Sequence, residues 1–271
     1  MTLAAVWRVD ERVYAIADTR ITREAGNILT DRGPKLLPIT LVCKQVDISE
    51  PPVYQTTIGY AYAGATLPAL ATHALANTLC QNLLGPAGAN LPGLDLVTIE
   101  VRDIADRYIR EIGELSGLGS LFSAIVFGFC PQANRFRAFR IIPELDGGVL
   151  STKISEHDLY GSDTLLVIGN RPELLRERVC IERPKLYADP QGISPQMQTL
   201  REIDLPKRAL QSLIDEGADE NIGGAIQAAW LTRAGFQPVF HRDQKLGFAV
   251  LGFNISEFNV GPYAFAPPGR M

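Results

Sequence analysis

The sequence predicts mixed α and β structure, because strand-like and helix-like hydrophobic patterns both occur along it in separate blocks. Two short apolar runs open the chain, LAAVWRV at 3–9 and VYAIA at 13–17, and they are typical of a hairpin turning at Asp10-Glu11. Two longer stretches, 68–84 and 95–115, place apolar residues at helical spacing. Blocks of strands followed by blocks of helices favour the α+β class.

The remaining elements follow in the same order. An apolar stretch after Lys35 and a segment at 42–53 predict a strand and its edge, and 54–63 predicts a further strand. Later strands are expected at 121–129, 135–142, 164–168, 236–241 and 248–253, and helices at 172–179, 205–216 and 222–233. Residues 182–204 contain several prolines and are interpreted as an irregular insertion.

The start of the chain offers a candidate nucleophile. Met1 is followed by Thr2, a residue small enough for the initiator methionine to be removed. The trimmed chain would carry a hydroxyl and a free α-amine on one residue, and such an amine has a pKa of about 7.7–8.0, so it can accept a proton near neutral pH. A hydroxyl with its own backbone amine is a known catalytic arrangement.

Charged residues are expected near this nucleophile. The predicted hairpin returns the chain to its beginning, so Asp18 and Arg20 should lie close to Thr2, and the loop that follows leads to Lys35. A lysine buried beside a carboxylate would stay charged and lower the pKa of neighbouring groups. Taken singly, these residues have ordinary interpretations: a surface ion pair for Asp18 and Arg20, and a solvated loop residue for Lys35.

Together these positions resemble the proteasome β-type peptidases and HslV-like members of the N-terminal-nucleophile hydrolases, including the bacterial proteasome homologues. The residues that carry the resemblance are Thr2, the Asp18-Thr19-Arg20 triplet with Thr22 after it, Lys35 in Gly33-Pro34-Lys35-Leu36, and Ala63-Gly64. The resemblance runs from Thr2 to about residue 240. It implies that Thr2 is the nucleophile and that the amide of Gly64 stabilises the oxyanion.

The resemblance assigns further roles along the chain. Asn170 in Gly169-Asn170-Arg171 takes the place of a family serine near the nucleophile's amine, and Asp219 matches a family aspartate that holds the geometry, as Arg20 does. Ile222 replaces a serine of the family's proton relay. A mainly apolar specificity pocket would be lined by three residues: Ile21, Tyr62 and Thr66.

The fold that this family implies is a four-layer αββα sandwich, in which two sheets are covered on both outer sides by helices. The expected domain covers 1–242, with the insertion near 182–204, and a final strand and Pro/Gly-rich arm cover 243–271. The family also implies a homo-oligomeric ring with its active sites facing an interior chamber. Peptides or unfolded proteins would be the substrates, and an unfolding ATPase is a possible partner.

Composition excludes several other classes. A net charge of −4 and the lack of a basic run argue against nucleic-acid binding, and no uncharged apolar stretch is long enough for a membrane span. The four cysteines are scattered, and His73, His157 and His241 lack metal-ligand spacing, so no metal or other cofactor is expected. These features, with the lack of a signal-peptide pattern, predict a cytoplasmic protein.

Two alternative functions remain open at this stage. One is a catalytically silent ring or scaffold subunit, which Ile222 and Asn170 favour and which retention of Met1 would favour more strongly. The other is a related N-terminal-nucleophile amidase that acts on a small molecule. The leading hypothesis is a threonine-type endopeptidase that cleaves peptide bonds through Thr2.

Overall fold

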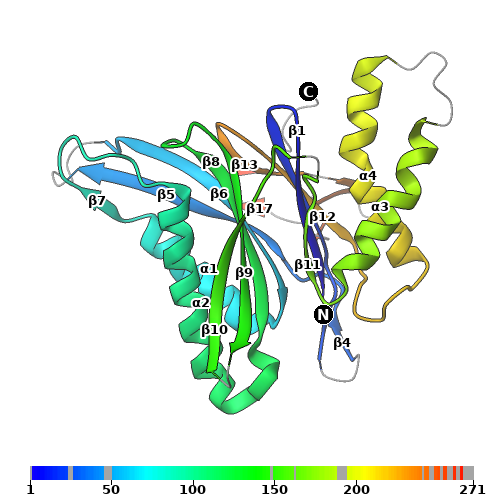
Figure 1. Cartoon of the computed structure of the whole chain (residues 1–271), viewed down its shortest axis with the longest axis horizontal. Helices are drawn as coiled ribbons and strands as arrows, with labels where there is room; N and C mark the ends of the chain where they lie inside the picture. The colour runs from blue at the N-terminus through cyan, green and yellow to red at the C-terminus, as the bar shows by residue number, and fades with distance from the viewer. Residues whose placement is uncertain are drawn as a thin grey trace.

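The structure is a computed structural model, and it describes most of the chain. The described residues are 2–23, 27–45, 51–146, 149–161, 163–187, 194–239, 241–243, 247–250, 253–254, 259–260 and 263–264. Two β-sheets stand at the centre, with one pair of helices on the outer side of each (Figure 1). The predicted α+β class and the four-layer αββα sandwich are both confirmed.

The first sheet carries the N-terminal strand. Its five strands are ordered β11 (Leu166–Gly169), β1 (Leu3–Val9), β2 (Arg12–Asp18), β12 (Ile226–Thr232) and β13 (Gly235–Pro238). Each neighbouring pair is antiparallel. The predicted hairpin at the start of the chain is therefore confirmed, and its two strands lie at the middle of this sheet.

The second sheet carries the segments around Lys35 and Gly64. Its six strands are ordered β10 (Val149–His157), β9 (Arg135–Asp146), β8 (Phe122–Cys130), β6 (Tyr54–Gly64), β5 (Leu36–Gln45) and β7 (Leu83–Gly85). Only the pairing of β5 with β7 is parallel. β10 was not anticipated, because the polar residues of VLSTKISEH obscure its alternation.

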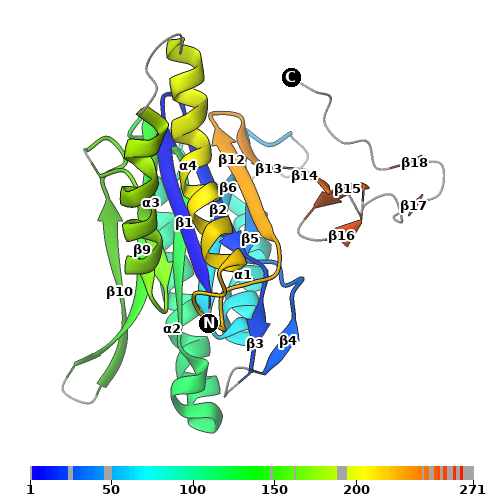
Figure 2. The same ribbon diagram turned by 90° about the vertical axis from the view of Figure 1, so that its right-hand side faces the viewer.

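Four α-helices cover the outer faces of the sheets. α1 (Thr66–Cys80) and α2 (Leu94–Ser116) lie on the second sheet, and a 3-10 turn, η2 (Gly117–Ser120), leads from α2 into β8. α3 (Pro172–Tyr187) and α4 (Pro195–Asp215) lie on the first sheet, in front of β1, β2 and β12 in Figure 2. The shorter strands are β3 (Ile21–Thr22), β4 (Ile28–Thr30), β14 (His241–Asp243), β15 (Gly247–Val250), β16 (Phe253–Asn254), β17 (Asn259–Val260) and β18 (Tyr263–Ala264).

Alternation along the strands builds the layers. On β1, Ala4 and Val6 face the second sheet, whereas Leu3 and Ala5 pack against α3 and α4. On β6, Ala61 and Ala63 face the first sheet, and their neighbours Tyr60 and Tyr62 pack beneath α1 and α2. Both faces of each central strand are buried, which explains why β1 reads as a continuous apolar run rather than an alternating one.

Two expectations about the later chain are wrong. The segment predicted as a helix at 222–233 contains strand β12, because its residues pair with β2 in register and Ala229 lies opposite Ala15. The segment 182–204 is largely helical: α3 continues to Tyr187, and α4 begins at Pro195. Proline suits the first turn of a helix, and Ser194 caps α4 by accepting a hydrogen bond from Met197. The domain limits, and the status of 182–204 as an insertion, stay predictions.

Gly169, at the end of β11, lies against the start of the chain. Its φ is +142°, and an added Cβ would come within 2.1 Å of the Thr2 carbonyl oxygen. Only glycine suits that conformation and that approach. Because Gly169 has no side chain, the end of β11 can pack directly on the Thr2 backbone.

We expect Gly169→Ala to lower the free energy of unfolding more than Gly217→Ala does. Both positions have positive φ, but an added Cβ at Gly217 meets nothing within 4 Å. The shared backbone strain costs about 1–2 kcal/mol. The collision at Gly169 should add ~1–3 kcal/mol. Urea unfolding of both variants checks this, and equal losses would contradict the close contact with Thr2.

Candidate active site

The hydroxyl of Thr2 lies at the centre of a buried polar cluster. Lys35 Nζ is 2.5 Å from Thr2 Oγ1 and 3.1 Å from Asp18 Oδ2, and it also donates to the Arg20 carbonyl. Thr2, Asp18 and Lys35 are at most 3% exposed. The structure therefore brings together the three side chains that the sequence placed at one end of a sheet, and Lys35 is not a solvated loop residue.

Hydrogen bonds show that Asp18 and Lys35 form a charged pair. Burial raises the pKa of Asp18, and the charge of Lys35 opposes that shift. Asp18 accepts from the amides of Leu3, Arg20 and Gly223 as well as from Lys35, and only a carboxylate has the acceptors for all four. The Lys35 ammonium likewise has three N–H donors, one for each of its acceptors: Thr2 Oγ1, Asp18 Oδ2 and the Arg20 carbonyl.

Burial also makes Lys35 more acidic than an ordinary lysine. Removal from water lowers the pKa of Lys35 to about 8, and the negative charge of Asp18 limits that decrease. Lys35 remains mainly protonated at pH 7. Because its ammonium donates to Thr2 Oγ1, it can stabilise negative charge that develops on that oxygen, but it cannot accept the hydroxyl proton in this state.

Backbone contacts tie the cluster to distant parts of the chain. The Gly223 amide donates to Asp18, and the Gly223 carbonyl accepts from the amides of Thr19 and Arg20. A Cβ on Gly223 would lie 2.3 Å from the Arg20 guanidinium carbon, so any larger residue here would displace the Arg20 side chain. Ile222, in the position of the family serine, packs in the core beneath α3 and α4. A backbone amide, not a side-chain hydroxyl, therefore contacts Asp18 here.

The side chains of Arg20 and Asp219, which were also expected at the site, form their hydrogen bonds outside the buried cluster. The Arg20 side chain binds Asp31, with Nε 2.7 Å from Oδ1, and donates to the Glu220 carbonyl, so it holds the loop and points away from Thr2. Asp219 accepts two hydrogen bonds from Asn221 within its own turn. It does not join the buried cluster among the described residues.

The direction of the Gly64 amide follows from the pairing of β6 with β8. Ala65 N donates to Leu121 O, so the preceding pair, Gly64 and Phe122, is a non-hydrogen-bonded pair and the Gly64 N–H points away from β8. It faces the β5 side, where Tyr62 N donates to Lys35 O and the ladder ends.

The three residues expected in the specificity pocket are largely occupied by internal contacts. Tyr62 is fully buried, and its hydroxyl donates to the Pro34 carbonyl at 2.9 Å. Thr66 opens α1 and interacts with the Tyr62 hydroxyl, and Ile21 packs on Gly33. Burial raises the pKa of Tyr62 to about 12, so it stays neutral.

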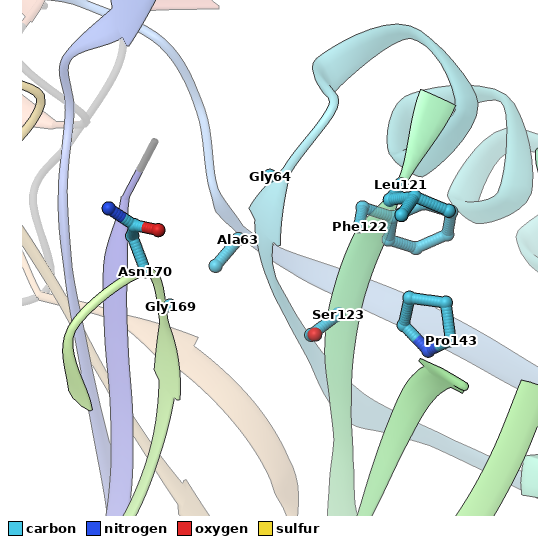
Figure 3. A pocket seen from close by; sticks show the side chains of 8 residues that line it. All are labelled: Ala63, Gly64, Leu121, Phe122, Ser123, Pro143, Gly169 and Asn170. Carbon is cyan, nitrogen blue, oxygen red and sulfur yellow. The ribbon is translucent and has the colours of Figure 1, made fainter. Parts of the chain in front are cut away.

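A cleft lies beside this cluster, between the ends of β6 and β11. It is lined by Ala63, Gly64, residues 121–123, Pro143, Gly169 and Asn170 (Figure 3). Asn170, expected near the nucleophile, is therefore at the rim of the cleft next to Gly169, which contacts Thr2. Residues 121–123 and Pro143 were not anticipated, because nothing in their local sequence marks a site.

Gln227 is a further residue that the sequence did not reveal. It is 1% exposed, and its Oε1 accepts from the amides of Lys35 and Leu36 at 2.9 and 3.0 Å, while its Nε2 donates to the Gly33 carbonyl. One amide side chain on β12 thereby satisfies the backbone at the point where Lys35 enters β5. Its position on a strand mistaken for a helix concealed this role.

Two further kinds of feature, a metal-binding group and a membrane-spanning helix, are absent from the described residues. Within them, no group of three or more His, Cys, Asp or Glu side chains is arranged to hold a metal ion. None of the helices in the described ranges has the length and hydropathy needed to cross a membrane.

Comparison with known proteins places the fold. No protein-family model and no curated protein matches this sequence. The structure is similar to a Gly-1 mutant of Anbu from Hyphomicrobium sp. strain MC1, with a TM-score of 0.58 and 18% identity over 88% of this chain and 85% of that chain. A second Anbu structure from the same organism gives a TM-score of 0.52 and 16% identity over the same shares.

These matches correct the family assignment. The expected place among the proteasome β-type and HslV-like peptidases is wrong, because the matched structures are Anbu proteins and no family model matches. The four short motifs that contain Thr2, Asp18, Lys35 and Gly64 are therefore not sufficient to assign the chain to one family. At 16–18% identity, the similarity establishes the proteasome-like N-terminal-nucleophile fold and nothing finer.

We expect Asp18→Asn to destabilise the protein strongly, because it leaves the Lys35 ammonium buried without its counter-charge. Breaking one side of such a pair costs about 3–5 kcal/mol. The double variant Asp18→Asn with Lys35→Met removes both charges and should regain much of that loss. Urea unfolding of the single and double variants measures the coupling, and simply additive losses would mean that the pair is not charged.

Proposed function

We propose that this protein is a threonine peptidase of proteasome-like type, whose nucleophile is Thr2 after removal of Met1. One observation carries the proposal: a buried ammonium lies 2.5 Å from the Thr2 hydroxyl and is paired with a buried carboxylate. Burying both charges is costly, and an apolar pair of similar size would serve stability as well or better. Their position at a hydroxyl near the chain start suits a nucleophile.

The proposed reaction begins with acyl transfer. The α-amine of Thr2 takes the hydroxyl proton through a water molecule, since Lys35 already donates to that oxygen. Thr2 Oγ1, whose developing negative charge Lys35 stabilises, then forms a bond to the peptide carbonyl carbon, and the Gly64 amide stabilises the resulting oxyanion. Loss of one such donor typically slows catalysis by about 10²–10³.

The remaining steps release two products. The protonated amine gives its proton to the leaving nitrogen as the C–N bond breaks, which leaves an ester on Thr2. A water molecule, deprotonated by the same amine, attacks the ester and restores the hydroxyl. Arg20 supports this geometry through its carbonyl, and Asp219 through the turn before Gly223.

We further propose that the chain works as a homo-oligomer that encloses its sites. Large apolar side chains are exposed on the outer helices, including Leu67 on α1, Leu96 and Leu115 on α2, and Leu200 on α4. Apolar surface of this kind supports association with further copies of the chain. A ring geometry, peptide or unfolded-protein substrates, an unfolding ATPase and a cytoplasmic location stay predictions.

Intact mass measurement tests the nucleophile. After treatment with a β-lactone, the purified chain should lack Met1 and carry a single adduct, because only Thr2 combines a hydroxyl with a free amine. Thr2→Ala should lose the adduct, while Thr164→Ala should retain it. A chain that keeps Met1 and forms no adduct would instead support the scaffold alternative.

The rate of this labelling should depend on pH through the amine and Lys35. Labelling should rise through about pH 7.7–8.0, where the α-amine loses its proton. It should then stop rising above about pH 8, because Lys35 loses its stabilising charge in that region. Lys35→Met removes the stabilising charge, so it should slow labelling by about 100-fold or more. A stopped time course at each pH, read by mass, measures both effects, and an unchanged rate in Lys35→Met would exclude its proposed role.

A further inference from the structure

The cleft beside Thr2 is the open end of the space between the two sheets. Ala63 belongs to the apolar layer between the sheets, whereas its neighbour Tyr62 faces α1 and α2. Gly64 ends β6 on one side of the opening, and Gly169 ends β11 on the other. None of Ile21, Tyr62 and Thr66 lines this cleft, so it is distinct from the pocket that the sequence led us to expect.

This cleft adjoins the reacting groups at two points. Gly64, the proposed oxyanion donor, forms part of its wall. Gly169 forms another part and touches the Thr2 carbonyl, since even a methyl group on it would collide there. A substrate whose carbonyl reaches the Gly64 amide would consequently place an adjoining residue at the cleft.

The lining combines apolar walls with two uncharged polar groups. Ala63 supplies apolar surface beside Ser123, and none of the lining residues carries a charge. Figure 3 shows the Ser123 hydroxyl directed into the opening and Asn170 on the facing side. Within the described chain, neither the Ser123 nor the Asn170 side chain has a recorded hydrogen-bond partner, so both can bind a ligand.

The cleft is small. Its volume is about 140 Å³. Pockets that enclose a whole small molecule typically measure ~300–1,000 Å³. The space suits one short side chain, and it is too small to enclose an entire small-molecule substrate.

We propose that this cleft binds a small hydroxyl-bearing side chain, threonine or serine, of the substrate residue next to the cleaved bond. The proposal rests on the proposed peptidase function and specifies its substrate. The methyl group of threonine would contact Ala63, and its hydroxyl would exchange hydrogen bonds with Ser123 and Asn170. A charged side chain would lose its hydration there without a counter-charge, and an aromatic ring would not fit.

Internally quenched peptides test this selectivity. A parent peptide is varied one residue at a time on each side of its cleaved bond, with threonine, valine, lysine, aspartate or tryptophan, and kcat/KM is measured on the full, trimmed chain. At one of these positions threonine should exceed its isostere valine by about 3- to 10-fold, the effect of one or two hydrogen bonds. Lysine, aspartate and tryptophan should be cleaved least.

Two variants assign the preference to the cleft. Ser123→Ala and Asn170→Ala should each reduce the ratio of kcat/KM for the threonine peptide to kcat/KM for the valine peptide, and Ser155→Ala, at an exposed position on β10, is the matched control that should leave this ratio unchanged. Asn170 is exposed, so its truncation should leave folding intact even if Ser123→Ala does not.

The outcomes separate the two proposals. Cleavage without a threonine preference, or with a preference that both variants retain, overturns the assignment of the cleft and leaves the peptidase intact. No cleavage of any peptide together with no β-lactone adduct at Thr2 overturns the peptidase, and the cleft proposal with it. An adduct at Thr2 without peptide cleavage overturns the cleft as a peptide-binding site.

Discussion

The buried contact between the Lys35 ammonium and the Asp18 carboxylate is the constraint around which this protein is organised. Both groups are almost fully removed from water, so each needs the other and a complete set of hydrogen bonds. The carboxylate accepts hydrogen bonds from the backbone amides of Leu3, Arg20 and Gly223, and the ammonium donates to the Thr2 hydroxyl. A requirement of electrostatics thereby determines where four segments of the chain must meet.

The two sheets contribute different residues to this buried cluster. The first supplies Thr2 and Asp18 on paired strands, and the second supplies Lys35 at the entry to β5. Gln227 joins them, because it sits on β12 of the first sheet and binds the backbone of the second. Relative sliding of the sheets would break these bonds, so the sandwich itself fixes the distance between hydroxyl and ammonium.

Local sequence was sufficient for the parts of the site near the start of the chain. The hairpin, Asp18 and Lys35 follow from short-range patterns, and β1 and β2 lie where the apolar runs predict them. Contacts of long sequence separation were not predictable. Gln227 lies on a strand whose apolar residues also fit a helix, and only pairing with β2 decides between the two. The cleft likewise depends on residues of β6, β8, β9 and β11 that lie far apart in the sequence and are brought together only by the fold.

The involvement of Gly223 and Gln227 has a consequence for biosynthesis. Initiator methionine is removed while a polypeptide is still short, yet the amide that binds Asp18 and the side chain that fixes Lys35 are translated more than 200 and 190 residues later, respectively. A nascent polypeptide on the ribosome can thus expose its terminal threonine long before that residue has a competent environment. Under the proposed function, late completion of the fold would keep the threonine inactive until synthesis of the chain is nearly finished.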